Sequence, residues 1–330
     1  MSVKSYVCIA SAVAVTACSG EDELQGCEET VNHATQAVSQ DPVFVNGGVL
    51  TFATDSAYEA YSLQMANADE ETRINTEHKL GFQSMVTFAD SLQLCESELT
   101  IEARFPDLFS SDFDGHSDLD IPTQYAVVCN PDGYFRIGDR LFKVTKSLMG
   151  YVVDGDCGDV SDAIEGKEMP ECAEYRVWSI SSAGSNLKAA RQGCGQTQIK
   201  TSAKNARWWM DYTIRVYVDK APSNHVLLYI EQKAKHFRKR HKWSSWREHS
   251  NQCYSRNIKG KIIHPLYSKG DFAIGDWYAK NNAVNQSNTT KVAELYSQLA
   301  YEDVEPYFAS IYGSAGSEGL GTTIITILCQ

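Results

Sequence analysis

Apolar and polar positions in the N-terminal part of the chain predict a short strand followed by three helices. Val49–Phe52 has the composition of a strand, and Thr54 or Asp55 can act as the N-cap of the helix that follows. A more polar helix over Asp69–Leu80 ends at Gly81, which tolerates the left-handed conformation of a C-cap. The apolar side chains of the third helix recur at helical spacing: Phe82, Met85, Val86, Ala89 and Leu92.

The segment Thr123–Lys146 predicts a three-stranded antiparallel meander. Its strands are Tyr125–Cys129, Tyr134–Ile137 and Arg140–Thr145, and its turns are Asn130-Pro131-Asp132-Gly133 and Gly138-Asp139. A loop that cradles phosphate would need a Gly-rich turn that opens a helix, and neither turn is followed by a helical pattern. Both turns are therefore interpreted as structural.

The C-terminal half has the pattern of a β-rich domain. Residues 154–206 are rich in Gly, Ser and Asp and are interpreted as linking loops, whereas strands are predicted over 212–218, 225–237, 252–263 and 322–329. One helix is expected among them, with the apolar residues Val292, Leu295, Tyr296 and Leu299 at helical spacing. The predicted fold is α+β: N-terminal helices with a small antiparallel meander, then a β-rich, sandwich-like C-terminal domain.

Length and charge indicate two globular units of opposite charge. The 330 residues suit two domains. Residues 1–175 hold 31 acidic residues and 9 Lys/Arg, whereas 176–330 hold 11 and 21, so the formal charges are −22 and +10. We expect a signal peptide (1–17), a flexible tether (18–41), an acidic module (42–155), a cysteine-containing linker region (156–206) and a basic β-rich domain (207–330). Either the opposite charges of the two halves complement each other, or the basic half binds an anionic partner.

The first residues have the features of an export signal. Lys4 precedes the short apolar run "YVCIASAVAVT", which is followed by a small-residue cleavage pattern. "VTAC", Val15 to Cys18, resembles the lipobox of bacterial lipoproteins, in which the cysteine receives a diacylglycerol; the alternative is an ordinary signal peptidase site. The following "SGEDE" resembles the export signal of surface-exposed lipoproteins in Bacteroidota. The expected location is the outer membrane, lipid-anchored at Cys18 and exposed at the cell surface.

Cysteine parity agrees with lipidation. The ten cysteines, less Cys8 in the signal and Cys18 under lipid, leave an even set of eight, as a disulfide framework in an exported protein requires. Two disulfides are hypothesised: Cys157 with Cys172 across a polar loop, and Cys129 with Cys95. No Cys-x-x-Cys pair and no combined Cys/His ligand spacing is present, so zinc is not expected.

An acidic loop, "SDFDGHSDLD", is a candidate calcium site. It brings together four carboxylates around one glycine: Asp112, Asp114, Asp118 and Asp120. The calcium-loop pattern would end on Ile121, so the bidentate terminal acid is missing. The alternative is a solvated acidic loop, and no other cofactor is expected.

A basic stretch, "KAKHFRKRHKWSSWREH" (233–249), is a candidate surface for an anionic partner. Cations interleaved with aromatic rings suit anionic polymers. The candidate contact residues are Lys235, Arg238, Arg240, Lys242, Trp243 and Trp246. Because nucleic acid is not expected outside the cell, the partner would be an anionic glycan or an acidic protein surface. The alternative is an exposed hairpin tip whose tryptophans pack inward.

The order "LTF", "GFQSMVTF" and "NPDGYFRIGDRLFKVT" resembles a group of secreted lipoproteins of Bacteroidota whose function is uncharacterised. The resemblance covers about residues 45–155. It implies an N-terminal helical segment, a hairpin with an Ile-Gly-Asp turn and a β-rich C-terminal region. It brings no catalytic residues.

No signature of a known catalytic site is present. The chain has no Gly-x-Ser-x-Gly, no His-Glu-x-x-His and no P-loop. The leading hypothesis is a binding or structural lipoprotein. The alternatives are an envelope hydrolase with a site between the two modules, and a subunit of a surface assembly or fibre in which the opposite charges of the halves pair between copies.

Overall fold

The structure is a computed structural model of the whole chain. It describes residues 42–95, 103–106, 108–111, 117–180, 197–204, 208–223, 225–239, 247–248, 253–263, 270–278, 285–296, 307–317 and 320–328. The expected signal peptide and tether, with Cys18, lie outside these residues. In the described part of the chain, no helix is both long and apolar enough to span a membrane.

The three N-terminal helices form as the sequence predicts. They are α1 (Asp55–Ala66), α2 (Glu70–Leu80) and α3 (Met85–Cys95). Thr54 is the N-cap of α1 and accepts a hydrogen bond from the Ala57 amide at 3.2 Å. Gly81 ends α2 in the left-handed conformation, with φ of 66°.

A six-stranded sheet, here sheet I, accompanies these helices. In spatial order its strands are β1 (Val43–Asn46), β2 (Val49–Phe52), β5 (Tyr134–Ile137), β6 (Arg140–Val144), β7 (Leu148–Val153) and β8 (Tyr175–Ser179). Only β2 and β5 pair in parallel within this sheet. The second and third predicted meander strands are confirmed as β5 and β6, and the two predicted turns join Cys129 to β5 and β5 to β6.

The first predicted strand of the meander is wrong. Its first two residues, Tyr125 and Ala126, end a one-turn helix, α5 (Thr123–Ala126), and the others form the turn that follows. Residues 121–129 are all buried, so this segment has no solvent-facing side on which polar residues would mark the periodicity. The apparent alternation of Tyr125, Val127 and Cys129 was uninformative because Ala126 and Val128 between them are apolar too.

The C-terminal half forms two further sheets. Sheet II contains β9 (Thr197–Lys204), β10 (Trp208–Asp219), β11 (His225–Arg238), β12 (Arg247–Glu248) and β16 (Asn285–Tyr296). Sheet III contains β13 (Cys253–Ile263), β14 (Asp271–Ala273), β15 (Trp277–Tyr278), β17 (Tyr307–Ser317) and β18 (Gly321–Leu328). All their described pairings are antiparallel. Helices at the N-terminus with a β-rich, sandwich-like C-terminal part confirm the predicted α+β fold.

Two local predictions for this half are corrected. The segment with Val292 and Leu295 is strand β16, not a helix; a bulge beside Leu228 and Tyr229 inserts Val292 and breaks the two-residue alternation. The segment 156–206, interpreted as loops, contains helix α6 (Cys157–Glu165), β8 and β9. Helix α6 begins with a capping box in which Asp156 and Asp159 bind each other's backbone amides.

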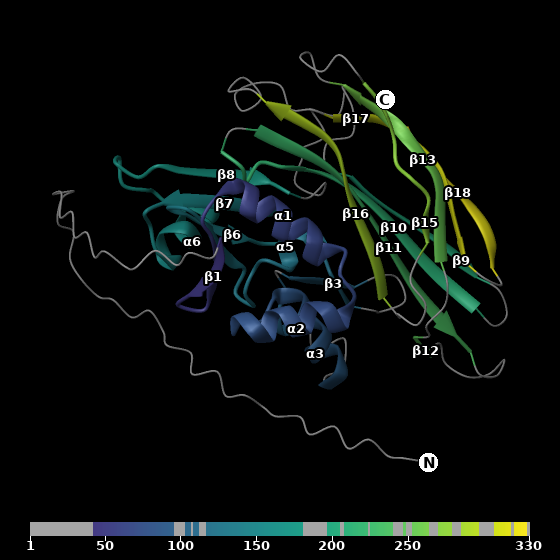
Figure 1. Cartoon of the computed structure of the whole chain (residues 1–330), viewed down its shortest axis with the longest axis horizontal. Helices are drawn as coiled ribbons and strands as arrows, with labels where there is room; N and C mark the ends of the chain where they lie inside the picture. The colour runs from purple at the N-terminus through teal and green to yellow at the C-terminus, as the bar shows by residue number, and fades with distance from the viewer. Residues whose placement is uncertain are drawn as a thin grey trace.

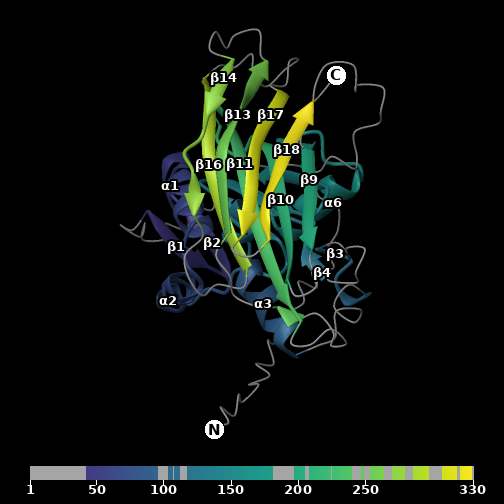
Figure 2. The same cartoon turned by 90° about the vertical axis from the view of Figure 1, so that its right-hand side faces the viewer.

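The elements stack in layers. Sheet I with α6 lies at one side, α1 and α5 lie between sheet I and sheet II, and sheet III covers the far face of sheet II (Figure 1). Seen from that far side, β13, β17 and β18 of sheet III lie in front of β10 and β11 (Figure 2). We call sheet I with the helices the N-terminal module, and sheets II and III the sandwich. A small ribbon of β3 (Phe109–Ser111) and β4 (Ser117–Leu119) completes the described elements.

Sheet II is buried on both faces, and each face has a different chemistry. The side chains that point toward sheet III are mostly aliphatic: Ile214, Val216, Val226, Leu228 and Ile230 belong to one core cluster with Ile258 and Ile311. The opposite face carries aromatic and ionisable residues, and Tyr217 and Tyr229 there join the core of the N-terminal module. The hydrophobic core of the N-terminal module therefore crosses the junction, while the core between sheets II and III is a separate cluster.

Candidate functional site

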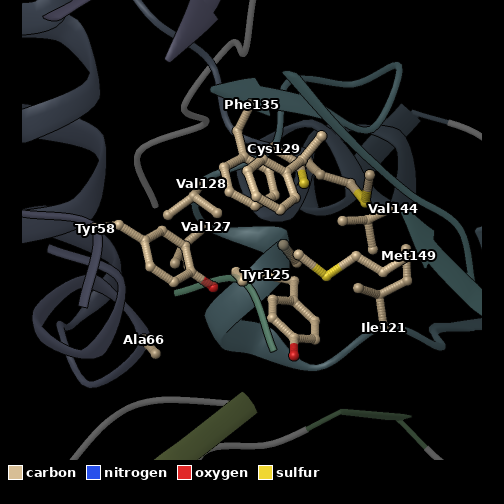
Figure 3. Close-up of a cluster of buried hydrophobic side chains, with 14 of the residues drawn as sticks. Tyr58, Ala66, Ile121, Tyr125, Val127, Val128, Cys129, Phe135, Val144 and Met149 are labelled. Carbon is tan, nitrogen blue, oxygen red and sulfur yellow. The ribbon is translucent and has the colours of Figure 1, made fainter. Parts of the chain in front are cut away.

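The most distinctive chemistry of the described residues lies in this junction. Helices α1 and α5 carry Tyr58 and Tyr125 toward sheet II, and both side chains are fully buried. Figure 3 shows Tyr58 beside Val127 and Val128, and Tyr125 near Met149 and Ile121, in the apolar cluster of the N-terminal module. The phenol groups lie at the edge of that cluster, where strand β10 ends at Asp219.

Asp219 is a fully buried carboxylate held from both modules. The Tyr58 hydroxyl donates a hydrogen bond to Oδ2 at 3.0 Å, and the Ala221 amide donates to Oδ1 at 2.9 Å. The two bonds use one oxygen each, so the carboxylate fixes helix α1 to the β10–β11 connection. Hydrogen bonds to a buried charged group are among the stronger contributions of single contacts to stability.

Burial is the main cause of the pKa shifts of Asp219 and the buried tyrosines. Burial raises the pKa of Asp219 to about 6, although the bonds from Ala221 and Tyr58 oppose the shift. Burial also raises the phenol pKa values of Tyr58, Tyr125 and Tyr217 well above the usual range, with the negative charges of Asp219 or Glu231 adding to the effect. The tyrosines therefore stay neutral and serve as hydrogen-bond donors or packing surfaces.

Gln124 extends the contact between the modules. Its Oε1 accepts a hydrogen bond from the Tyr217 hydroxyl at 2.8 Å, and its Nε2 donates to Ser62 Oγ at 3.0 Å. All three side chains are almost completely buried. One amide thus joins α1, α5 and β10, and a residue without both donor and acceptor could not do so.

A second buried carboxylate, Glu231 of β11, organises the start of α5. Its Oε1 accepts a hydrogen bond from the Thr123 amide at 2.8 Å, and Lys233 and Arg215 lie at 3.5 and 3.7 Å. Burial alone would raise the pKa of Glu231, but the two cations and the Thr123 bond outweigh it and lower that pKa. Arg215 also binds Asp120 at 2.9 Å.

Polar contacts at the rim of the junction complete the connection. Asp55 accepts hydrogen bonds from Arg140 at 2.5 Å and from the Ser223 hydroxyl at 2.6 Å. Glu59 and His225 are 2.5 Å apart. Each pair except Asp55–Arg140 joins an α1 residue to the sandwich. The rim of the junction therefore carries further polar contacts around the buried tyrosines, Gln124 and the two carboxylates.

The arrangement is suited to holding two modules together rather than to chemistry on a substrate. Asp219 and Glu231 are 0% and 1% exposed, so no substrate reaches them without separation of the modules. Among the described residues, no group of three or more His, Cys, Asp or Glu side chains is arranged to hold a metal ion.

The predicted calcium loop is only partly described. Asp112 and Asp114 lie outside the described residues, and Asp118 belongs to strand β4. Asp120 forms the salt bridge with Arg215 noted above. The structure therefore gives Asp120 a role in the junction and does not test the loop.

The structure describes only two of the six residues of the predicted basic surface, Lys235 and Arg238. Lys235 is 9% exposed; it lies opposite Asp211 in the β10–β11 register and its Nζ is 5.7 Å from the centre of the Phe237 ring. Arg238 is exposed, with its guanidinium 4.9 Å from the Trp208 ring centre. Arg240, Lys242, Trp243 and Trp246 lie outside the described residues. Lys235 is thus an inward cation of sheet II.

Neither hypothesised disulfide forms. Cys129 is a thiol in the apolar core, where burial raises its pKa, so it is not bonded to Cys95 (Figure 3). Cys157 also keeps its thiol, so it is not the partner of Cys172, which is disulfide-bonded elsewhere. The segment between Cys157 and Cys172 was predicted to be a polar loop. It contains helix α6 instead, and the helix separates the two cysteines.

The junction residues were missed by sequence reasoning. Asp219 and Glu231 stand within apolar runs, "YVDK" and "YIEQK", and each looks like the solvent-facing member of an alternating strand. A usable signal was the near absence of polar residues on either face of "HVLLYIE", which is typical of a strand covered on both sides.

Comparisons with known proteins give one distant similarity. No family model matches the chain, and no curated protein matches it. Among solved structures, a DUF4848 family protein from Bacteroides thetaiotaomicron is similar at 12% identity with a TM-score of 0.28, over 86% of this chain and 98% of that one. That neighbour comes from a Bacteroidota bacterium, as do the lipoproteins that the sequence resembles, but at this TM-score the similarity carries no argument about fold or function.

Proposed function

We propose that the protein is an exported lipoprotein of the outer membrane that acts as a binding or structural module. Its lipid anchor is Cys18, and the basic sandwich presents the surface that meets an anionic partner outside the cell. The N-terminal module serves as a rigid support for the sandwich. The partner is an anionic glycan or an acidic protein surface.

The observation that supports this proposal most directly is that Asp219 and Glu231 connect the two modules. Both carboxylates lie in the packed junction and bind groups of the opposite module, at 3.0 Å for Tyr58 and 2.8 Å for Thr123. Buried carboxylates whose hydrogen-bond donors belong to the opposite module hold the two modules in one arrangement. This use weighs against a hydrolase with its site between the modules, because the described part of that interface is filled by side chains.

The charge distribution supports an anionic partner for the sandwich. Residues 176–330 carry 21 Lys/Arg against 11 acidic residues. An excess of one charge on an extracellular module raises the local concentration of oppositely charged ligands and speeds association. The N-terminal module, with the opposite excess, would not compete for the same ligand.

The anchor and the binding activity are tested separately. Mass spectrometry of the protein from its native membrane is expected to show a diacylated Cys18, and Cys18→Ser is expected to release the protein from the membrane. Binding of the full chain to envelope material is expected to weaken as salt rises. The proposal would be contradicted if Cys18 were unmodified and the protein either bound envelope material independently of salt or did not bind it at all.

A further inference from the structure

The outer face of sheet III carries cations and aromatic rings close together. Along β13, Tyr254, Arg256, Lys259 and Lys261 point away from the sandwich, while Ser255, Ile258 and Ile262 between them are buried. Two tyrosines from neighbouring strands join this face: Tyr278 of β15 lies opposite Tyr254, and Tyr312 of β17 lies opposite Lys259. We call these six residues the β13 strip; Figure 2 views the sheet from this side.

A β-bulge keeps the cations on one face. Arg256 and Lys259 are three residues apart, so in a regular strand they would point to opposite faces. The register with β17 shifts between them, and Asn257 adopts the left-handed conformation with φ of 56°. The Asn257 amide donates to Asp276 at 3.1 Å, which stabilises the bulge. The extra residue places both cations outward, which is a common use of bulges near functional surfaces.

Arg256 is oriented by aromatic rings and not by a carboxylate. Its guanidinium lies 4.7 Å from the centre of the Tyr254 ring and 5.5 Å from that of Tyr278. Within the described residues, Arg256, Lys259 and Lys261 make no salt bridge. Asp271 is opposite Lys261 in the register of β13 and β14, whereas no acidic residue is opposite Arg256 or Lys259 in the described pairings of β13.

The exposure of the tyrosines is unusual for this protein. Tyr278 is 58% exposed and Tyr312 is 40% exposed, and they account for two of the four large exposed apolar side chains in the described residues. A ring with an exposed face can stack on the C–H face of a sugar, while a guanidinium binds a carboxylate through two parallel hydrogen bonds. The strip extends for about 20 Å from Tyr254 to Lys261, enough for a short run of sugars.

We propose that the β13 strip binds a polysaccharide that contains uronic acids. In this arrangement Arg256 binds a sugar carboxylate, Tyr254 and Tyr278 hold the guanidinium in place and Tyr278 stacks on a sugar ring. Lys259 and Lys261 attract neighbouring carboxylates along the strand. The inference deepens the proposed function by giving the anionic partner a chemical class and a location distinct from the predicted stretch 233–249.

Affinity electrophoresis of the full chain in gels that contain polygalacturonate, with neutral dextran as the comparison, tests the inference. The polyuronate is expected to retard the wild type and dextran is not. Arg256→Gln is expected to weaken the affinity by about tenfold, as loss of a charge-assisted pair does, and Tyr278→Ala by about fivefold, as loss of a stacked ring does.

Matched substitutions at exposed positions of the N-terminal module serve as controls: Tyr175→Ala on β8 and Lys79→Gln on α2. Both are expected to bind like the wild type. Thermal unfolding of each variant confirms that the fold is retained.

Three outcomes separate the inference from the proposed function. Wild-type affinity in Arg256→Gln and Tyr278→Ala, with a loss in Arg238→Glu instead, would overturn the β13 strip and leave an anionic partner in place. No retention of the wild type by polyuronate, with salt-dependent binding to envelope material intact, would overturn the glycan class alone. Loss of both binding activities together with an unmodified Cys18 would overturn the proposed function as well.

Discussion

Glu231 of strand β11 accepts a hydrogen bond from the amide of Thr123, the first residue of helix α5, at 2.8 Å. The N-cap of this helix is Pro122, whose side chain cannot accept such a bond. The sandwich therefore supplies the cap that the helix lacks, and the start of α5 depends on a residue 108 positions later in the chain.

Replacement of Glu231 tests this dependence. Glu231→Ala leaves the Thr123 amide unsatisfied and Arg215 and Lys233 without their buried counter-charge, so we expect a loss of about 3 kcal/mol in the free energy of unfolding. Glu231→Gln keeps an acceptor and should lose less. Urea unfolding measures both, with Glu165→Gln on the exposed side of α6 as a control that should stay within about 0.5 kcal/mol of the wild type. Equal stability of the Ala variant and the control would refute the role.

Removal of the Tyr58 hydroxyl tests the other buried carboxylate. Tyr58→Phe keeps the ring, which stacks with Phe135 at 5.4 Å, and removes only the bond to Asp219. We expect a cost of about 1 to 3 kcal/mol, because one oxygen of a buried carboxylate loses its donor. Tyr175→Phe, at an exposed position, is the matched control. Indistinguishable denaturation midpoints for the two variants would show that the bond contributes nothing.

Asp219 gives the stability a defined dependence on pH. Its pKa is about 6 in the folded protein against an ordinary value of 3.8, so the folded state holds the proton more tightly. The contribution of Asp219 is therefore fully present below about pH 4 and is lost as pH rises through 6, by about 3 kcal/mol in total. In unfolding measurements from pH 4 to 7, Asp219→Asn should lack this decline. Parallel curves for the variant and the wild type would contradict the assignment.

The two glycines of the meander turns should differ in their tolerance of alanine. Both have positive φ, 91° for Gly133 and 58° for Gly138. A Cβ at Gly133 would lie 2.5 Å from the carbonyl oxygen of Val144, whereas nothing lies within 4 Å at Gly138. Gly138→Ala should cost only the backbone strain, about 1 kcal/mol, and Gly133→Ala should cost clearly more. Thermal unfolding compares them, and an equal shift in midpoint would argue against the steric cause.

The sequence predicted those elements whose signals are local. Thr54 and Gly81 mark the ends of helices by capping chemistry, and Gly133 and Gly138 mark turns, so each acts through its immediate neighbours. The α+β class followed from the same kind of signal. The errors occurred where tertiary contacts decide: α5 is buried on every side because it lies in the middle layer, and β16 has a bulge at Val292 that imitates helical spacing.

The junction could not be predicted for a related reason. Tyr58 and Asp219 are 161 residues apart, and only the register of β10 and β11 brings Asp219 and Glu231 to the face that meets α1 and α5. For the cysteines, the sequence predicted contacts that the structure lacks. The even number of cysteines suggested a disulfide for Cys129, but this residue is enclosed by apolar side chains and packs as a small apolar residue does.

Asn67, at the C-terminal end of α1, forms the same pair of hydrogen bonds with the backbone of strand β16 that a neighbouring strand would form. Its side-chain Nδ2 donates to the Thr289 carbonyl at 2.9 Å, and its Oδ1 accepts from the Thr289 amide at 2.8 Å. β16 has β11 on one side only in the described pairings, so its other edge would otherwise offer these backbone groups to a strand from another molecule. One amide side chain thus closes the sheet at this point, and growth of sheet II by strand addition from a second chain is blocked there.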